Sequence, residues 1–427
     1  MLYMKYKMQD KQNQLIEIIS DQHLVVGVDI AQHLHVARAV NYRGLVIGEP
    51  ITFENNEIGF VKFQSWLNKL KSLQGYEDEI VGMEPTGHYW FNLSQWLYNR
   101  GTDVVTVNPH HVKRNKENRD NTQSKSDKKD ALVIADMIKN GYYSFIHPTT
   151  EVFAELRVLM ANRDFITKRL VSSINQINRW VDIVFPELRQ VFKDVKGKGA
   201  IATLRLFPTP IELQTLEVDY IIKAWKTQLK RHCGIKKAQS LIYLAKQSVG
   251  TTQAIDAHKL HLEQLLEEFD LATSQLEKVE KATESTLDRI TYTKKILNIQ
   301  GISEISLGGI LGEAGDLSNF AHGNSLLRHA GLNLAEASSG KWSGQIVISK
   351  RGRSRLRRYL FLTTLSLVKN NAEFKALHTN NVKVKKMKKM KSIMKLIGKL
   401  ARILVGMARN NTAYCPKKVL PITSTVA

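Results

Sequence analysis

Four acidic residues near the N-terminus have the types and the spacing to hold a divalent metal. Asp29 stands at the end of one apolar run and Glu84 at the end of another, in GMEPTGHYW. Asp127 and Asp130 are three residues apart in KSDKKDA, so both would project from one face of a helix. Oxygen ligands suit Mg²⁺, with Mn²⁺ as the alternative, and two such ions neutralise the charge that develops when a phosphodiester is cleaved. The four acids together predict phosphoryl transfer on a nucleic acid.

Each of these positions also has an ordinary structural interpretation. An Asp-x-x-Asp pair at a helix N-terminus commonly caps the helix and complements its dipole. Lys125, Lys128 and Lys129 are near enough in the sequence to pair with the two carboxylates instead. His88 either contacts a phosphate, orients Glu84, or is a half-buried histidine at a helix start. The metal hypothesis therefore depends on all four acids occurring in one fold.

A second candidate for chemistry is the serine segment around residue 340. Ser338 and Ser339 precede Gly340 in what the sequence predicts as a flexible loop. A serine hydroxyl is a poor nucleophile unless it is deprotonated or metal-activated, and no His–Asp partner is evident, so a hydrolase triad is excluded. Cations that clamp a phosphate would lower the cost of attack on it. The candidate cations beside the serines are Lys341, Lys350, Arg351, Arg353, Arg355, Arg357 and Arg358.

Positive charge is concentrated in the same C-terminal region. The 427-residue chain carries a net charge of +22, and residues 341–427 account for +20 of it, with Glu373 as their single acid. The densest part is KVKKMKKMK at 383–391, which contains Lys385, Lys386, Lys388 and Lys389. A solvated tail is the alternative, but charge on this scale favours contact with nucleic acid.

The N-terminal acids lie within an alternation of strand and helix patterns. Strands are expected at 24–30, 35–41, 45–54, 79–83 and 104–107, and helices at 58–73, 90–98 and 126–139. Three strands followed by helix, strand, helix and strand is the order of an α/β RNase H-like (RuvC-like) fold. That fold carries acids at the ends of its first and fourth strands. We expect it to form a domain over residues 1–148.

Residues 149–295 are predicted as a helical middle region. Helical patterns cover 149–190 and 260–290, with mixed helix and no recognisable motif at 191–258. The second long helix has a heptad seam, made of Leu262, Leu265, Phe269, Ala272, Leu276, Val279, Thr283, Thr286 and Ile290. This seam predicts either a helix pair within the chain or a coiled-coil contact between subunits.

Residues 296–427 are predicted as a mainly α-helical third domain. LNIQGIS and the helix after it suggest either a helix–hairpin–helix, whose glycine turn can meet a phosphate, or a plain helical hairpin. Residues 392–408 have the spacing of an amphipathic helix. Cys233 and Cys415 match neither a disulfide framework nor a zinc site. Because the sequence also shows no signal peptide and no membrane-spanning run, a reducing cytoplasm and no membrane partner are expected.

The motifs also resemble a known family, nearly from end to end. VGVDIA, GMEPTGHYW, KSDKKDALVIA, LNIQGISEISLGGILGEAGDLSNF, HAGLN and SSGKWSGQIVISKRGRSRLRRYL resemble, in this order, stretches of the DEDD-type insertion-sequence transposases that carry a C-terminal serine domain. This is the family of bridge-RNA-guided DNA recombinases. The resemblance implies a RuvC-like domain with Asp29, Glu84, Asp127 and Asp130 as its acids. It also implies a serine transposase domain with Ser339 as the nucleophile and Ser338 as the fallback.

The same resemblance implies a mechanism and partners. Ser339 would attack a DNA phosphodiester to form a phosphoserine link, and Mg²⁺ on the carboxylates would assist. A structured non-coding RNA would select donor and target DNA, and a dimer or tetramer would assemble in the prokaryotic cytoplasm at the nucleoid. Two alternatives stay open. One is a metal-dependent nuclease or resolvase that uses water, and the other is a nucleic-acid-binding protein without catalysis.

Overall fold

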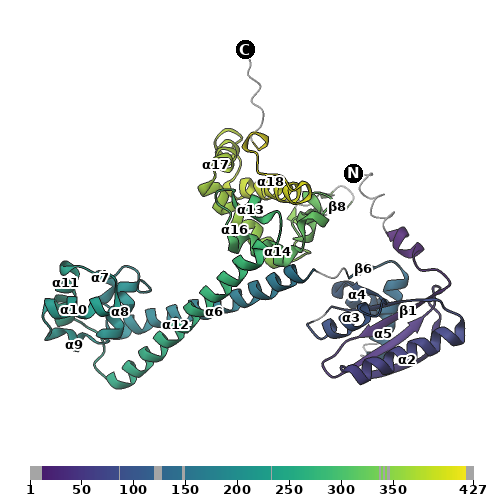
Figure 1. Cartoon of the computed structure of the whole chain (residues 1–427), viewed down its shortest axis with the longest axis horizontal. Coiled ribbons are helices and arrows are strands. Elements are labelled where there is room, and N and C mark those ends of the chain that lie inside the picture. The colour runs from purple at the N-terminus through teal and green to yellow at the C-terminus, as the bar shows by residue number, and fades with distance from the viewer. Residues whose placement is uncertain are drawn as a thin grey trace, which may run out of the picture. The chain divides into compact units, whose positions relative to one another are not determined.

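The chain divides into two compact units, Met1–Pro148 and Thr149–Ala427. The structure, a computed structural model, describes residues 12–85, 87–119, 127–146, 150–231, 233–335, 338–339, 342–343 and 347–419 (Figure 1).

The first unit contains a six-stranded mixed sheet. Its strands are β1 (His23–Asp29), β2 (Leu34–Val40), β3 (Val46–Glu54), β4 (Asp78–Met83), β5 (Asp103–Val107) and β6 (Tyr143–Phe145). The strand order is β3-β2-β1-β4-β5-β6. Strands β1, β4 and β5 are parallel, whereas β2, β3 and β6 are each antiparallel to their neighbours. The parallel strands therefore bring their carboxyl ends to one edge of the sheet.

Helices cover both faces of this sheet. They are α2 (Glu57–Gln74), α3 (Trp90–Tyr98), α4 (Pro109–Arg119) and α5 (Asp127–Lys139). Because side chains alternate along a strand, Val26 and Val28 of β1 join one core with α2 and α3, while Val25 joins the other with α5. Val25 and every second residue after it on β1 therefore point to the face on which α5 packs.

The predicted strands and helices of this unit lie close to the observed ones. Each predicted strand bound lies within one residue of the observed bound. Helix α4 and strand β6 were not predicted. The sequence of α4, PHHVKRNKENR, is polar apart from the buried Val112, so it offers no apolar period, and β6 has only three residues.

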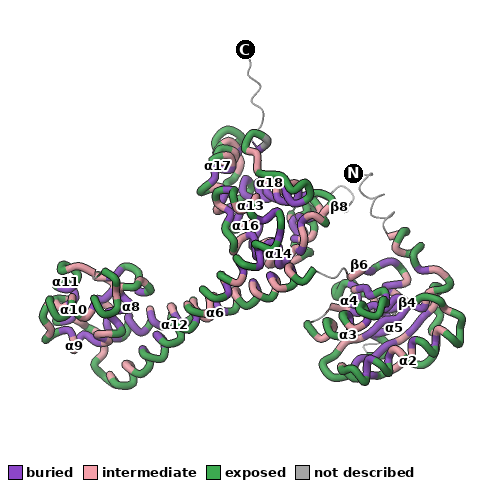
Figure 2. Tube along the Cα trace, in the orientation of Figure 1, coloured by how far each residue is buried: buried purple, intermediate pink, exposed green. Residues whose placement is uncertain are grey.

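The second unit is built on two long helices, α6 (Glu151–Val184) and α12 (Ile255–Asp288). They are antiparallel neighbours, because Arg163 pairs with Glu280 and the Trp180 indole donates to the carbonyl of His258. Most of the predicted heptad seam of α12 is buried, although Phe269 and Leu276 are half-buried and Ile290 lies beyond the helix. The main neighbour of α12 is α6 of the same chain, and buried residues occur along the pair in Figure 2. Of the two predicted arrangements, the structure shows the helix pair within the chain.

One end of this helix pair carries a small helical head. It consists of α7 (Leu188–Val191), α8 (Lys198–Leu206), α9 (Pro210–Gln214), α10 (Val218–Gln228) and α11 (Ile235–Lys246). Its core gathers around Trp180 of α6 and Trp225 of α10. This region, which the sequence indicated only as mixed helix, thus has a hydrophobic core of its own.

The other end carries a C-terminal lobe. Its helices are α13 (Thr293–Leu297), α14 (Glu304–Ala314), α15 (Gly323–His329), α16 (Ser354–Asn370), α17 (Ala372–Thr379) and α18 (Lys389–Asn410). Phe153, Leu156 and Met160 of α6 belong to the core of this lobe. The predicted amphipathic helix at 392–408 is α18, which buries one face in that core. Among the described residues, no helix is long and apolar enough to span a membrane.

Candidate functional site

Asp29 and Glu84 occupy equivalent positions at the carboxyl ends of two neighbouring strands of the sheet. Strands β1 and β4 are parallel, with Gly27 opposite Gly82 and Val28 opposite Met83. Asp29 is the next residue on β1, and Glu84 follows β4 directly. Both residues are partly buried. The pairing of β1 with β4 therefore puts these two acids at the ends of neighbouring strands.

The glycines before these acids bring α5 close to the sheet. A Cβ atom at Gly27 would overlap the carbonyl oxygen of Ala131, and one at Gly82 would overlap the side chain of Ile138. Residues two apart on a strand share a face, so Asp29, two positions beyond Gly27, points to the side on which α5 lies. Glu84 follows β4 directly, so it lies at the same edge of the sheet.

The direction of α5 places its first turn at the same edge. Its last residue, Lys139, packs on Gly44, where a Cβ atom would stand 3.1 Å from the lysine Cε. Gly44 lies in the turn between β2 and β3, which is at the amino edge of β1 because Val40 pairs with Val25. The opposite end of α5, which holds Asp127 and Asp130, therefore points toward the carboxyl edge.

The two acids of α5 are not equivalent. Asp130 is 7% exposed, whereas Asp127 is exposed. Asp130 directly precedes Ala131, the residue that packs on Gly27, so the close approach at that glycine also draws Asp130 inward. The predicted alternative partners Lys128 and Lys129 are exposed, and Lys125 lies outside the described residues. Asp130 is thus the helix acid best placed to act with the strand acids.

The carboxylates share an edge without forming a finished metal cage. Among the described residues, no three His, Cys, Asp or Glu side chains lie close enough together to hold a metal ion. The types of these residues nevertheless suit a hard divalent cation, because all the candidates at this edge are carboxylates, carried by the ends of two strands and the first turn of one helix. His88 is exposed, with its ring 4.2 Å from that of Tyr89, and is not the half-buried histidine of one alternative.

The candidate serines lie in a β-hairpin and not in the predicted loop. Ser338 and Ser339 form β8, and their backbones pair with those of Ser343 and Trp342 in β9 (Trp342–Ser343). The hairpin is based on a second ladder between β7 (Leu334–Ala335) and β10 (Val347–Ile348). The serine side chains and Lys341 lie outside the described residues. Strand pairing was missed because only two backbone positions pair in each ladder.

The base of this hairpin is tied to the lobe. The guanidinium of Arg357 donates to the carbonyl of Ala330 at 2.8 Å. A Cβ atom at Gly352 would overlap the backbone nitrogen of Gly331, so the chain segments on either side of the hairpin touch directly. The hairpin base is thus fixed to the helices around it.

Three of the predicted phosphate-binding arginines have partners within the lobe. Arg355 contacts the Asp164 carboxylate at 2.9 Å and the Glu313 carboxylate at 3.1 Å. Arg353 donates to the backbone carbonyl of Glu313 at 2.8 Å, and Arg357 binds the hairpin base. Guanidiniums held in this way connect α16 to α6 and α14 and stabilise the lobe. Sequence spacing could not indicate these ion pairs, because Asp164 and Glu313 are distant from the arginines along the chain.

Burial changes the acid–base properties of the groups around Glu313. The pKa of His329 is lowered by burial and further by the nearby Arg353. Burial and Arg353 likewise lower the pKa of Arg157, whose Nε donates to the carbonyl of Gly312. Arg157, Arg353 and His329 all lie near the buried carboxylate of Glu313. The positive charges of the two arginines favour the neutral form of His329.

The remaining predicted cations are open to solvent. Lys350, Arg351 and Arg358 are exposed, although Arg358 also lies 3.8 Å from Asp164. All the lysines of the 383–391 run are exposed, and within the described part of the chain none of them forms an ion pair; they are Lys383, Lys385, Lys386, Lys388, Lys389 and Lys391. These lysines are therefore available to a polyanion.

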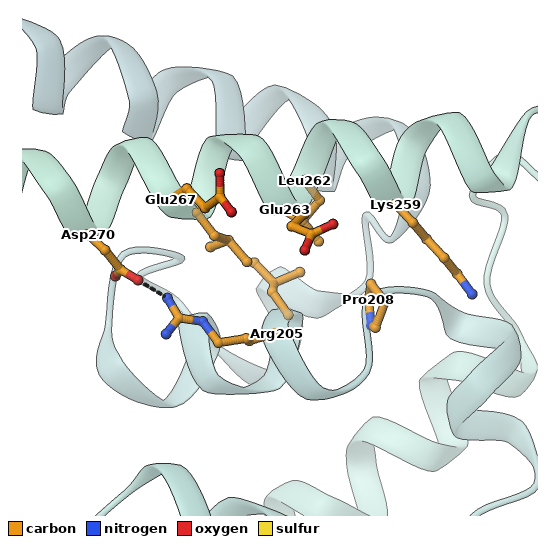
Figure 3. A pocket seen from close by; sticks show the side chains of 9 residues that line it. Arg205, Pro208, Lys259, Leu262, Glu263, Glu267 and Asp270 are labelled. Atoms are coloured by element: carbon orange, nitrogen blue, oxygen red, sulfur yellow. Dashed lines mark hydrogen bonds and ion pairs between the residues drawn. The ribbon is translucent and has the colours of Figure 1, made fainter.

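A pocket of about 370 Å³ lies elsewhere, between α8 and α12 in the helical head (Figure 3). Its apolar wall includes Leu262 and Pro208, and Arg205 at its rim pairs with Asp270 at 2.7 Å. None of the predicted site residues lines it. The pocket is a gap between packed helices whose rim arginine already has a partner, so we do not assign the chemistry to it.

Two parts of the chain match models of known protein families. Residues 26–186 match the DEDD transposase model of the IS110 type, described as a transposase. Residues 293–379 match the model described as transposase of the IS116/IS110/IS902 family. The first match contains all four acids, and the second contains both candidate serines. The two halves of the predicted chemistry thus fall in separate matched regions.

Two proteins of insertion elements are similar to the chain. The IS900 uncharacterized 42 kDa protein of Mycobacterium paratuberculosis is 22% identical over 298 residues, which are 69% of this chain and 74% of that protein. The IS116 uncharacterized 44.8 kDa protein of Streptomyces clavuligerus is 24% identical over 248 residues, which are 56% of this chain and 60% of that protein. The similarity covers less than two thirds of the second relative.

Proposed function

We propose that this chain is a transposase of the IS110/IS116 type, and that it cuts and rejoins DNA through a serine nucleophile assisted by carboxylate-bound metal. The two transposase models that it matches and its similarity to proteins of insertion elements support this proposal. The observation that carries the proposal is that Asp29 and Glu84 end two neighbouring parallel strands, and that the first turn of α5, with Asp130, points toward the same edge of the sheet. Asp127, exposed in the same turn of α5, would complete the set when substrate and metal are bound.

The sheet supports an RNase H-like (RuvC-like) assignment for this unit. Strand order β3-β2-β1-β4-β5, with the first three strands antiparallel and the next two parallel to β1, agrees with that fold. The domain limits that we propose are 1–148 for the RuvC-like domain, 149–295 for the helical linker, and 296–427 for the serine-containing transposase domain with its basic tail. Strand β6 then extends the sheet beyond the five strands.

The proposed reaction conserves the energy of the phosphodiester bond. The Ser339 hydroxyl oxygen attacks the phosphorus, a phosphoserine ester bond forms, and the bond from phosphorus to the leaving strand breaks, with that strand's oxygen taking a proton. A hydroxyl of a second strand then reverses the step and joins a new partner. Asp29, Glu84, Asp127 and Asp130 would hold a divalent cation, which supplies charge neutralisation at the phosphate. Mg²⁺ is the proposed ion and Mn²⁺ the alternative.

The basic surface supports nucleic-acid binding by the C-terminal lobe. The exposed cations Lys350, Arg351, Lys385, Lys386, Lys388 and Lys389 would contact backbone phosphates of donor and target DNA and of a structured guide RNA. Asp29 and Ser339 belong to different compact units, so a homo-oligomer in which subunits complete each other's sites is part of the proposal. We place the protein in the prokaryotic cytoplasm, at the nucleoid.

A second candidate function is a RuvC-like nuclease or resolvase that uses water. It is favoured by the same division into units, because the four acids belong to the first unit and both candidate serines to the second. In that case Ser339 would be only a structural residue of β8.

A suicide DNA substrate with Mg²⁺ and co-purified RNA separates these candidates. The proposal expects a covalent protein–DNA adduct that is lost in Ser339→Ala and in Asp29→Asn, and kept in Ser338→Ala. Asp78→Asn is the matched control, because Asp78 is an exposed acid at the amino end of β4, away from the carboxyl edge. Cleavage without an adduct would favour the nuclease, and binding without cleavage would contradict both.

A further inference from the structure

The short connection that follows Asp29 is held by two side chains that sequence analysis did not single out. Residues 30–33 link β1 to β2, and the backbone N–H of Ala31 donates to Nδ1 of His35 at 3.3 Å. The side-chain amide of Asn55 donates to the carbonyl of Gln32 at 3.3 Å. The backbone N–H of Asn55 donates to the carbonyl of His33 at 2.9 Å. Three successive residues of the connection are therefore fixed by His35 and Asn55.

The imidazole of His35 is itself held in place by the core. The His35 side chain is fully buried. The centroid of its ring lies 5.3 Å from that of Phe53, which is edge-on, and 6.3 Å from that of Phe60, which is stacked. Asn55 is equally constrained, because it directly precedes Asn56, whose side chain caps α2 by accepting the N–H of Gly59 at 2.8 Å. The support for the connection therefore extends into the start of α2.

Two buried polar atoms at this place need an explanation. Among the described residues, neither Nε2 of His35 nor Oδ1 of Asn55 makes a hydrogen bond of good geometry. The Asn55 side chain is still near enough to the imidazole to raise its pKa against the larger lowering by burial. An unsatisfied buried polar group is destabilising, and an apolar side chain would fill the same core position without that cost. Burial lowers the pKa of His35, so the ring is neutral and Nδ1 keeps the lone pair that accepts the Ala31 N–H. The polar groups are thus suited to hold the connection and poorly suited to packing alone.

We propose that His35 and Asn55 are positioning residues that fix the orientation of Asp29 by clamping the backbone that follows it. Asp29 is the last residue of β1 and pairs with Val36, the neighbour of His35 on β2. The backbone of Asp29 is therefore held by its pairing with β2 and by the clamped connection that follows it. The inference rests on the proposed function, in which Asp29 holds the metal. Groups that orient a metal-holding residue commonly affect metal affinity by roughly 10–100-fold when removed.

The test uses the full chain and substitutions at one position. His35→Leu fills the core but removes the acceptor, whereas His35→Asn keeps a side-chain oxygen near the place of Nδ1. Phe63→Leu is the matched control, because Phe63 is fully buried in the same core and stacks on Phe53 at 4.6 Å without a hydrogen bond to the connection. Two quantities are measured: hydrogen exchange of the amides at 30–33, and the Mg²⁺ concentration that gives half of the metal-induced rise in melting temperature.

We expect His35→Leu to speed exchange of the Ala31 amide and to raise the half-maximal Mg²⁺ concentration at least roughly tenfold. His35→Asn should recover most of both effects, and Phe63→Leu should lower the melting temperature without moving the Mg²⁺ midpoint. Equal Mg²⁺ midpoints for His35→Leu and Phe63→Leu would overturn the inference. Asp29→Asn distinguishes the two levels: if it leaves the wild-type midpoint unchanged, the proposed metal site itself fails, and the role of His35 fails with it.

Discussion

Gly27 of β1 and Gly82 of β4 face each other in the sheet, and α5 crosses both where side chains would otherwise stand. This contact positions the site, because the acids follow each glycine by two residues and the helix acids precede the contacting turn of α5. A small change at either glycine should therefore affect both stability and metal binding.

Gly27→Ala is expected to destabilise the first unit by about 3 kcal/mol or more, since the added methyl group meets a backbone carbonyl that cannot rotate away. Gly406→Ala is the matched control, because Gly406 is helical and has open space around its Cβ position. There alanine should raise the free energy of unfolding by up to about 1 kcal/mol. Urea unfolding of both variants measures the contrast; equal effects would contradict the close packing of α5.

Arg355→Ala is expected to destabilise the C-terminal lobe by roughly 2–4 kcal/mol. The substitution leaves Asp164 and Glu313 without their shared partner, and both carboxylates are largely buried. Arg351→Ala, which removes an exposed arginine four residues earlier, should change stability by less than about 0.5 kcal/mol. Thermal unfolding checks both values. Weakened DNA binding without any loss of stability in Arg355→Ala would restore the phosphate-binding role that the sequence predicted.

The lysine run should control the salt dependence of nucleic-acid binding. Replacing Lys385, Lys386, Lys388 and Lys389 with alanine removes up to four phosphate contacts, so the slope of log affinity against log salt should become shallower by up to about 3–4. The matched control replaces four exposed lysines of the helical head, Lys193, Lys196, Lys223 and Lys226. Titrations at several salt concentrations measure the slopes, and the lysine-run hypothesis does not survive if both variants change the slope equally.

Stability should fall as the solution becomes acidic. The pKa values of His35 and His329 are lowered in the folded protein from the ordinary value of 6.5. Between the lowered pKa and about 6.5 the unfolded chain binds a proton that the folded chain does not, so the free energy of unfolding decreases as pH falls below about 6.5. In His35→Asn the first unit should lose part of this pH dependence. Urea midpoints at about pH 5.5 and about pH 7.5 provide the comparison, and an unchanged pH dependence in His35→Asn would contradict the assignment.

Local patterns predicted most of the fold, because strands of alternating apolar residues and helices of regular period carry their own signal. Most of the seam of α12 was predicted, although Leu266 and Leu287 are also buried and were not in it. Its partner α6 follows only from the structure, since a heptad pattern does not identify which element covers the seam. The site divides in the same way. Asp29 and Glu84 were predictable from their strand ends, whereas the difference between Asp127 and Asp130 depends on how Ala131 meets Gly27.

Charge was the least informative signal at the level of single residues. The run of cations from Lys350 to Arg358 predicted one phosphate-binding block, but the structure separates it into exposed residues and arginines that bind Asp164 and Glu313. Buried partners from distant parts of the chain leave no local pattern. His35 was missed for a related reason, since its importance depends on Phe53, Phe60 and Asn55 around it.

The paired helices α6 and α12 also set a length. Each has 34 residues, which at 1.5 Å per residue corresponds to about 51 Å. Because their contact repeats every seven residues, the pair can be shortened or lengthened by whole heptads, in steps of about 10 Å, with the same faces kept in contact. A change of any other length would rotate the head about the helix axis. The helix pair thus acts as a spacer whose length can change in heptad steps. The distance between head and lobe can therefore be redesigned without altering either of their cores.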